Sequence, residues 1–199
     1  MTRLIWVRHA IADVSKGIIA GRGLEIGLSP TGILQARRLG DRLLEENLQA
    51  IFSSPQRRAR ETAEEIARTV GREISVADGL DELDYGEWTG RSFAQLDALP
   101  EWRAFNSTRS CTRIPGGEMI LEVQARTIRL CERLAGRYPR DAIALVTHAD
   151  VIRAALAYYL ALPIDLSLRL EVSPASRSIV TLDGHCPQVV CINCTGERM

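Results

Sequence analysis

Two of the three histidines in this chain of 199 residues occupy equivalent positions, each directly after a run of apolar residues. Arg8 and His9 follow the apolar run at residues 4–7, and His148 follows the run at residues 143–147. The carboxyl ends of parallel strands meet at one edge of a sheet, where open α/β sheets bind their ligands. Either histidine alone is typical of a packed, half-buried side chain, but the pair predicts two imidazoles in one ligand site.

Arginines accompany this histidine pair. Arg8 precedes the first histidine, and Arg58 lies in the first turn of a helix that we expect after the short strand at residues 50–53. A helix amino terminus surrounded by guanidinium groups binds a dianion through free N–H groups, the helix dipole and paired hydrogen bonds. Most helical arginines face solvent, and this remains our interpretation of Arg57 and Arg60. The combination predicts a phosphate site that contains an imidazole.

Five segments resemble, in the same order, motifs of the histidine phosphatase superfamily, in the branch that includes the cofactor-dependent phosphoglycerate mutases. They are residues 7–10 (VRHA), 53–63 (SSPQRRARETA), 80–90 (LDELDYGEWTG), 115–118 (PGGE) and 146–149 (VTHA). The resemblance covers nearly the whole chain, and within the family the chain resembles a phosphatase of the α-ribazole phosphatase type. Any one of these matches is weak, but five in order are specific.

The resemblance implies a two-step phosphoryl transfer with His9 as the nucleophile. Its neutral imidazole would form a phosphohistidine, which water then hydrolyses. Arg8, Arg58 and His148 would bind and stabilise the transferring phosphoryl group, each contributing roughly 10²–10³ in rate. Because these groups supply the positive charge, we expect neither a metal ion nor another cofactor.

The resemblance also selects the remaining site residues. Glu82 is expected to act as general acid and then as general base, a role worth roughly 10²–10⁴ in rate. Asp84 is the alternative, because several acids lie close together in this segment. Arg22 and Ser15, in the segment after the first histidine, are further candidates for substrate binding. An exposed loop arginine is an equally good interpretation of Arg22.

Several positions depart from the family pattern. Ala10 replaces the glycine that follows the first histidine, and we expect it to place a methyl group beside the phosphate. Ala12 and Ser15 replace a threonine and an asparagine, and Ala149 replaces another frequent glycine. The catalytic set is intact, so these replacements bear on the rate and on the substrate preference.

Helical patterns alternate with short β-branched runs along the chain, which predicts an α/β fold. Strands are expected at residues 4–7, 50–53, 73–77, 143–147, 177–182 and 188–192, and helices at residues 30–48, 55–70, 117–138 and 150–160. The last two strands form a hairpin. We predict a single domain over residues 1–199, with a three-layer α/β/α arrangement whose mostly parallel sheet has helices on both faces.

Local signals refine this scheme. Serine followed by proline marks an N-cap and the first helical position, and it occurs at Ser29 and again at Ser54. Residues 15–28 and 80–113 fit no regular element, and such stretches are usually functional loops, so we expect both near the histidines. The second segment supplies either an apolar wall for the leaving group or core packing through Trp88, Phe93, Trp102 and Phe105.

Composition excludes several classes of function. Acidic and basic residues balance at 25 each, so no bulk attraction to nucleic acid or an anionic membrane is expected. No secretory signal or apolar stretch of membrane-spanning length is present, which predicts a cytoplasmic protein. The five cysteines include a CINC segment at residues 191–194, but it lies in a strand-like run. We expect reduced, structural thiols.

Together these observations predict a cytoplasmic, metal-independent phosphomonoesterase that acts on a small molecule. Sugar phosphates and α-ribazole phosphate are the expected kinds of substrate. Three alternatives stay open. They are a cofactor-dependent mutase of the phosphoglycerate type, a weakly active protein that binds phosphoryl groups in a regulatory or scaffold role, and an enzyme that dephosphorylates phosphohistidine on a partner protein.

Overall fold

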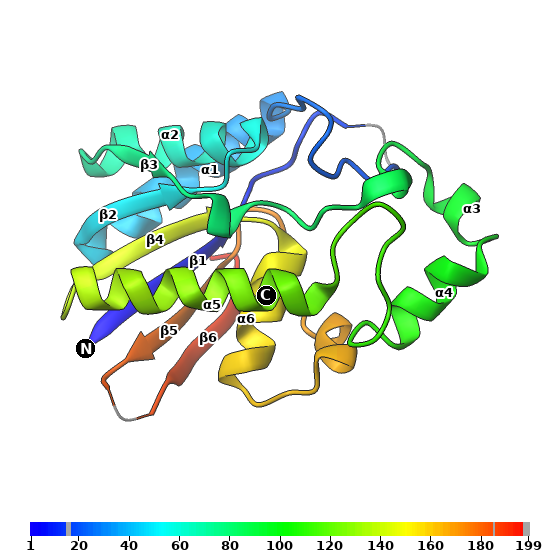
Figure 1. Cartoon of the computed structure of the whole chain (residues 1–199). Helices are drawn as coiled ribbons and strands as arrows, with labels where there is room; N and C mark the ends of the chain where they lie inside the picture. Colours follow the sequence, from blue (N-terminus) through cyan, green and yellow to red (C-terminus); the bar gives the residue numbers. More distant parts are fainter. Residues whose placement is uncertain (15–16, 185, 197–199) are drawn as a thin grey trace.

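The computed structural model describes residues 1–14, 17–184 and 186–196. The described chain forms a six-stranded sheet in the order β3-β2-β4-β1-β5-β6 (Figure 1). Its strands are β1 (Thr2–Arg8), β2 (Leu48–Ser53), β3 (Ile74–Val76), β4 (Ala142–Thr147), β5 (Arg177–Leu182) and β6 (Gln188–Cys194). Strands β1 to β4 run parallel, and β5 and β6 are antiparallel additions at one edge. The predicted α/β fold with a mostly parallel sheet is confirmed.

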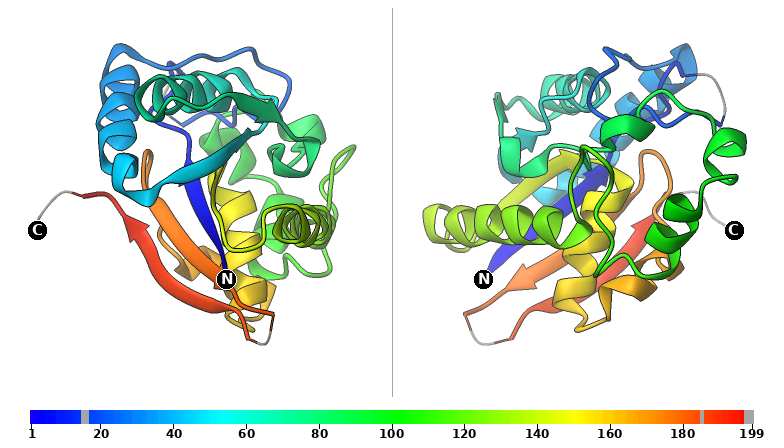
Figure 2. Two further views of the ribbon diagram at one scale, coloured as in Figure 1. Left: turned by 90° about the vertical axis from the view of Figure 1, so that its left-hand side faces the viewer. Right: turned by 45° about the vertical axis from the view of Figure 1, so that its right-hand side comes forward.

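Helices cover both faces of this sheet. α1 (Pro30–Leu43) and α2 (Arg57–Val70) lie on one face, and α5 (Ile120–Arg137) and α6 (Ala149–Tyr159) lie on the other (Figures 1 and 2). None of the helices in the described part of the chain is long and apolar enough to cross a membrane.

The alternation of side chains along β1 explains why two helical layers form. Ile5 and Val7 pack into the core beneath α1 and α2, whereas Leu4 and Trp6 pack beneath α5 and α6, and all four are fully buried. Successive strand residues point to opposite faces, so an uninterrupted apolar run requires cover on both. Each such burial contributes about 1.5–3 kcal/mol. The first strand is therefore held from both sides up to its last residue.

The two predicted serine caps have different outcomes. Ser29 caps α1, and its Oγ accepts a hydrogen bond from the Gly32 amide at 3.0 Å. The cap predicted at Ser54 is wrong, because α2 begins at Arg57 after Gln56. Ser54 stays in extended register with β4, and its amide donates to the carbonyl oxygen of Val146 at 2.9 Å. Its hydroxyl accepts a hydrogen bond from the Gln56 amide at 3.2 Å and also contacts the functional site described below.

The segment expected to be irregular contains short helices. They are the 3-10 turns Asp78–Leu80 and Gly86–Trp88, and the helices α3 (Phe93–Leu96) and α4 (Pro100–Ser107). Trp88 and Phe105 are buried there in a third apolar cluster, with Trp102 packed against it. Core packing is thus the correct interpretation of these three aromatic residues. The cluster includes Val151 and Ala154 of α6. The segment with the short helices is therefore anchored to a helix that covers the sheet.

Candidate active site

The hydrogen-bond register of the neighbouring strands β1, β4 and β2 places the residues that follow these strands side by side. The His9 amide donates to the carbonyl oxygen of Thr147 at 2.9 Å, so pairing between β1 and β4 continues beyond β1. The imidazole centroids of His9 and His148 lie 5.1 Å apart. The structure thus brings the two histidines together at the carboxyl edge of the parallel strands.

The His9 imidazole is held as a neutral base. Its Nδ1 lies 2.8 Å from the carbonyl oxygen of Ala10, which can only accept a hydrogen bond, so Nδ1 carries the proton. Nε2 consequently presents its lone pair. Burial, followed by the positive charges of Arg58 and Arg8, lowers the pKa of His9 to about 3. The ring is uncharged and oriented at neutral pH, as an imidazole nucleophile requires.

Glu82 lies beside the histidines in an environment that favours its protonated form. Burial raises its pKa to about 7, against the opposing charge of Arg58. Its Oε2 is 3.5 Å from Arg58 Nη2 and 3.3 Å from His148 Nδ1, and its Oε1 accepts from the Leu83 amide at 2.9 Å. A carboxyl group with a pKa near the working pH can both donate and accept a proton.

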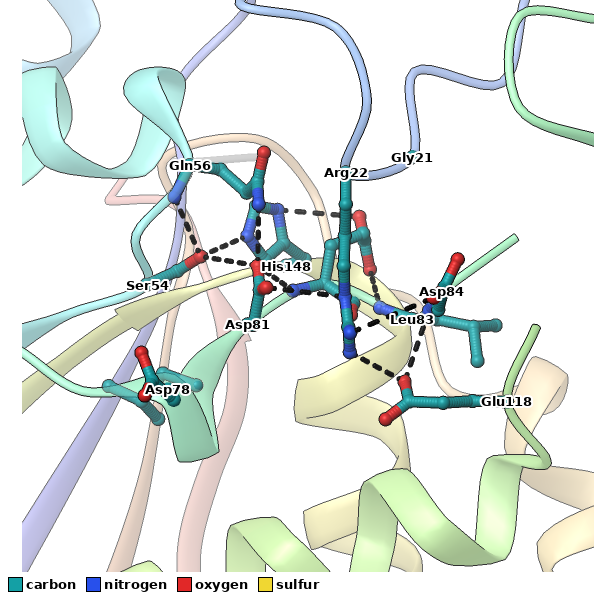
Figure 3. A network of polar contacts seen from close by, with 12 residues as sticks. Gly21, Arg22, Ser54, Gln56, Asp78, Asp81, Leu83, Asp84, Glu118 and His148 are labelled. Carbon is teal, nitrogen blue, oxygen red and sulfur yellow. Dashed lines mark hydrogen bonds and ion pairs between the residues drawn. The ribbon is translucent and has the colours of Figure 1, made fainter. Parts of the chain in front are cut away.

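His148 is fully buried and does not line the cavity described below. Burial and the charge of Arg58 lower its pKa well below the ordinary value. Its Nε2 lies 2.8 Å from Ser54 Oγ, which in turn lies 3.4 Å from Asp81 Oδ1 (Figure 3). Sequence reasoning missed Ser54, because the serine-proline pair matched a helix cap. Its place in the 53–63 motif, four residues before Arg58, was the available signal.

Arg58, which is buried, and Arg8, which is half-buried, each keep a buried N–H group without a partner among the described residues. Arg58 is 2% exposed, and its Nη2 donates to the carbonyl oxygen of Gly21 at 3.0 Å, while no described residue pairs with its buried Nη1. Arg8 donates from Nη1 to the carbonyl oxygen of Val172 at 2.6 Å, and its buried Nε is likewise unpaired among the described residues. A buried donor without a partner costs about 1–3 kcal/mol, which a bound anion would relieve.

A cavity of about 280 Å³ opens onto these groups. Its charged and polar lining comprises Arg8, His9, Arg58, Glu82, Tyr85, Asp150 and Arg153. Its apolar lining includes Val14, and also Ile18, Ile19 and Phe93, which come from the two segments predicted to be loops near the histidines. The volume suits a small phosphate ester.

The predicted substrate contact Arg22 has a different set of partners. Arg22 does not line the cavity, and its guanidinium contacts Glu118 Oε2 at 2.6 Å, Asp81 Oδ2 at 3.2 Å and the carbonyl oxygen of Glu82 at 2.6 Å (Figure 3). This geometry favours a role in holding the Glu82 backbone. Ser15 lies outside the described residues. The alternative acid, Asp84, accepts from the Gly86 amide at 2.9 Å and lies away from the cavity lining.

The methyl group of Ala10 does not lie beside the phosphate site, contrary to expectation. Ala10 is fully buried and packs in the core with Leu28 and Ala36, and its amide donates to Thr62 Oγ1 at 3.1 Å. Because His9 points into the cavity, the next side chain along the extended chain points the other way. Of the replaced positions, Ala12 and Ala149 line the cavity.

Comparison with known proteins identifies the family to which this chain belongs. The family model of the histidine phosphatase superfamily (branch 1) matches residues 4–195. Putative phosphoserine phosphatase 2 from Hydrogenobacter thermophilus is 28% identical over 199 residues, covering 97% of this chain and 96% of that protein. The structure of mycobacterial glucosyl-3-phosphoglycerate phosphatase with VO3 is 30% identical, with a TM-score of 0.87 over 96% of this chain and 98% of the other. YhfR from Bacillus stearothermophilus, 24% identical, shares the fold with a TM-score of 0.91 over 98% of both chains.

Proposed function

Because this chain belongs to branch 1 of the histidine phosphatase superfamily and is a phosphatase, we propose that it hydrolyses a small phosphate monoester through a phosphohistidine on His9. One observation carries this proposal: the same cavity holds a neutral imidazole that can attack phosphorus and a carboxyl group that can donate a proton. His9 is neutral with a free Nε2, while Glu82 has a pKa raised to about 7. No metal ion is needed in this mechanism.

In the first step, His9 Nε2 attacks phosphorus while the bond from phosphorus to the ester oxygen breaks. Glu82 in its protonated form donates its proton to the leaving oxygen, so the product alcohol departs neutral. Arg8 and Arg58 both line the cavity and would bind the phosphoryl oxygens. His148 adds a third polar group next to the ring of His9.

In the second step, water attacks the phosphohistidine. Glu82, now a carboxylate, takes a proton from that water, and the bond between phosphorus and Nε2 breaks to release inorganic phosphate. His9 returns to its neutral state and Glu82 to its protonated state. The hydrogen bond from Nδ1 to Ala10 keeps the ring in line in both steps.

The relatives indicate which esters to try first. Phosphoserine and glucosyl-3-phosphoglycerate, named for two similar phosphatases, are both phosphate esters of alcohols that carry a carboxylate, and the second also carries a glucosyl group. α-Ribazole phosphate belongs in the same screen, because the sequence resembles that type of phosphatase. The cavity of about 280 Å³ would enclose the phosphoryl group and a short leaving group.

The test measures release of phosphate from p-nitrophenyl phosphate in the presence of EDTA, for the parent protein and for His9→Ala. We expect turnover by the parent that survives EDTA and a loss of at least roughly 10³-fold in the variant. Rapid quenching of the parent with a ³²P-labelled ester should trap an acid-labile label on His9. Arg37→Gln, which alters an exposed arginine of α1, serves as the control for handling and folding.

The alternatives give different results in this experiment. A mutase would show little net release of phosphate and would depend on a bisphosphorylated cofactor. A weakly active binding protein would bind the ester without turning it over. Equal activity of the parent and His9→Ala would overturn the proposal.

A further inference from the structure

The cavity contains a second set of polar and charged groups beyond those assigned to the phosphoryl group. Asp150 and Arg153 belong to the first turns of α6, and Tyr85 follows Glu82 by three residues. All three line the cavity. No step of the proposed reaction uses them, so they are free to contact the part of the substrate that leaves.

The charge of Asp150 is already balanced. Its Oδ1 accepts from Arg109 Nη1 at 2.9 Å, and its Oδ2 accepts from the Tyr85 hydroxyl at 2.5 Å. Burial alone would raise the pKa of Asp150, but the charge and hydrogen bond of Arg109 lower it to about 2. Asp150 is therefore a carboxylate whose unit charge is matched by the buried guanidinium of Arg109. Tyr85 remains a neutral phenol, because burial and Asp150 raise its pKa.

Arg153 adds a further positive charge to the cavity, because Asp150 pairs closely with Arg109 at 2.9 Å and only loosely with Arg153 at 3.7 Å. Its Nε donates to the carbonyl oxygen of Leu170 at 2.9 Å, which fixes the side chain. Its Nη1 is 3.7 Å from Asp150 Oδ1, beyond hydrogen-bond distance, and no described residue accepts from Nη1 or Nη2. Glu171, a nearby acid, is exposed and does not line the cavity. Arg153 thus lines the cavity, and its two terminal nitrogens make no hydrogen bond to a described residue.

The chemistry of the Arg153 guanidinium indicates what the leaving group carries. Arg8 and Arg58 suffice for a phosphoryl dianion, so a third cation in so small a cavity would favour a second, singly charged anion on the substrate. A planar guanidinium fork matches a carboxylate in size, charge and hydrogen-bond geometry. Building on the proposed function, we infer that Arg153 binds a carboxylate on the leaving alcohol. The substrates are then phosphate esters of small hydroxy acids.

The inference is tested by binding to His9→Ala, which leaves esters intact, using two matched pairs of ligands. Phosphoserine is compared with phosphoethanolamine, and 3-phosphoglycerate with glycerol 3-phosphate, so that each pair differs in its carboxylate. We expect calorimetry to give roughly 10- to 100-fold tighter binding of the carboxylate member. Adding Arg153→Gln should remove this preference, Arg153→Lys should keep part of it, and Arg37→Gln should leave it unchanged.

Kinetics of the catalytically intact protein supply a second readout. In Arg153→Gln, kcat/KM should fall roughly 10- to 100-fold more for phosphoserine than for phosphoethanolamine. Equal losses for both esters would place Arg153 at the phosphoryl group and overturn the inference, as would a parent protein without preference for the carboxylate. If the parent hydrolyses no ester, the proposed function fails, yet the binding comparison still decides the role of Arg153.

Discussion

Two parts of the active site are held in place by different forces. The strand-end residues (Arg8, His9, Ser54 and His148) directly end or follow β1, β2 and β4. Main-chain hydrogen bonds set their positions, such as those from the His9 and Ser54 amides to Thr147 and Val146, both 2.9 Å. The sheet itself therefore aligns the nucleophile with the second histidine, and no side chain is needed to bring them together.

The Glu82 segment, residues 81–84, has no strand partner and depends on arginine side chains instead. Arg126 on α5 donates from Nη2 to the carbonyl oxygens of Asp81 at 2.7 Å and Glu82 at 3.0 Å. Glu118 joins Arg126 to Arg22, which donates to the same Glu82 carbonyl oxygen at 2.6 Å. The comparison shows that the nucleophile is positioned by backbone pairing, whereas the acid is positioned by a network of charges.

The largest effect should come from Glu82→Gln, which leaves the strand-end residues in place and removes the acid. We expect kcat/KM for phosphoserine to fall by roughly 10²–10⁴, because an alkoxide leaves poorly without a proton. The loss for p-nitrophenyl phosphate should be much smaller, since nitrophenolate needs little protonation. Equal losses for the two esters would show that Glu82 does not act as the acid.

The protonation of Glu82 also predicts how kcat/KM depends on pH. Burial raises the pKa of Glu82 to about 7, so the proton-donating form predominates below pH 7 and is lost above it. In the parent protein, kcat/KM for phosphoserine should therefore decline as the pH rises through about 7. This alkaline limb should be absent in Glu82→Gln.

A smaller effect is expected from Arg126→Gln, which loosens the Glu82 segment without removing a group from the cavity. A shift of the acid by about 1 Å can cost up to 10²-fold, and we expect roughly a 10-fold loss in kcat for phosphoserine with a displaced alkaline limb. Arg129→Gln, at an exposed position of the same helix, is the matched control. Loss of thermal stability with an unchanged pH profile would indicate that Arg126 supports folding alone.

The smallest effect on activity is expected from Ala10→Gly, next to the nucleophile. The lost methyl group lies in the core, so unfolding in urea should show a destabilisation of about 1–2 kcal/mol from lost burial and added chain entropy. We expect kcat to change by less than about 2-fold, because no cavity atom is removed. A several-fold rise in kcat would mean that the methyl group does restrict the phosphate site.

The strand-end residues could be predicted from the sequence because apolar runs and register are local properties. An uninterrupted apolar run that ends in a histidine indicates both a buried parallel strand and the edge at which the imidazole emerges. The direction of Ala10 follows from the same rule, since neighbours along an extended chain alternate. The sequence contained that information, although the family pattern suggested otherwise.

The contacts of Arg22 could not be predicted in this way. Its partner Glu118 is 96 residues further along the chain, and no periodicity relates the two positions. Ser54 illustrates a different limit, because serine followed by proline is a valid cap signal. There, strand pairing with Val146 keeps the chain extended and delays the helix to Arg57.

The unpaired N–H groups of Arg8 and Arg58 have a consequence for how the enzyme operates over time. They would recognise phosphoryl oxygens, and inorganic phosphate offers the same oxygens as the ester from which it came. The product can therefore satisfy the same buried donors and delay the next turnover. Inhibition by the product phosphate is therefore expected. The rate of turnover would then depend on the ambient phosphate concentration as well as on the supply of substrate.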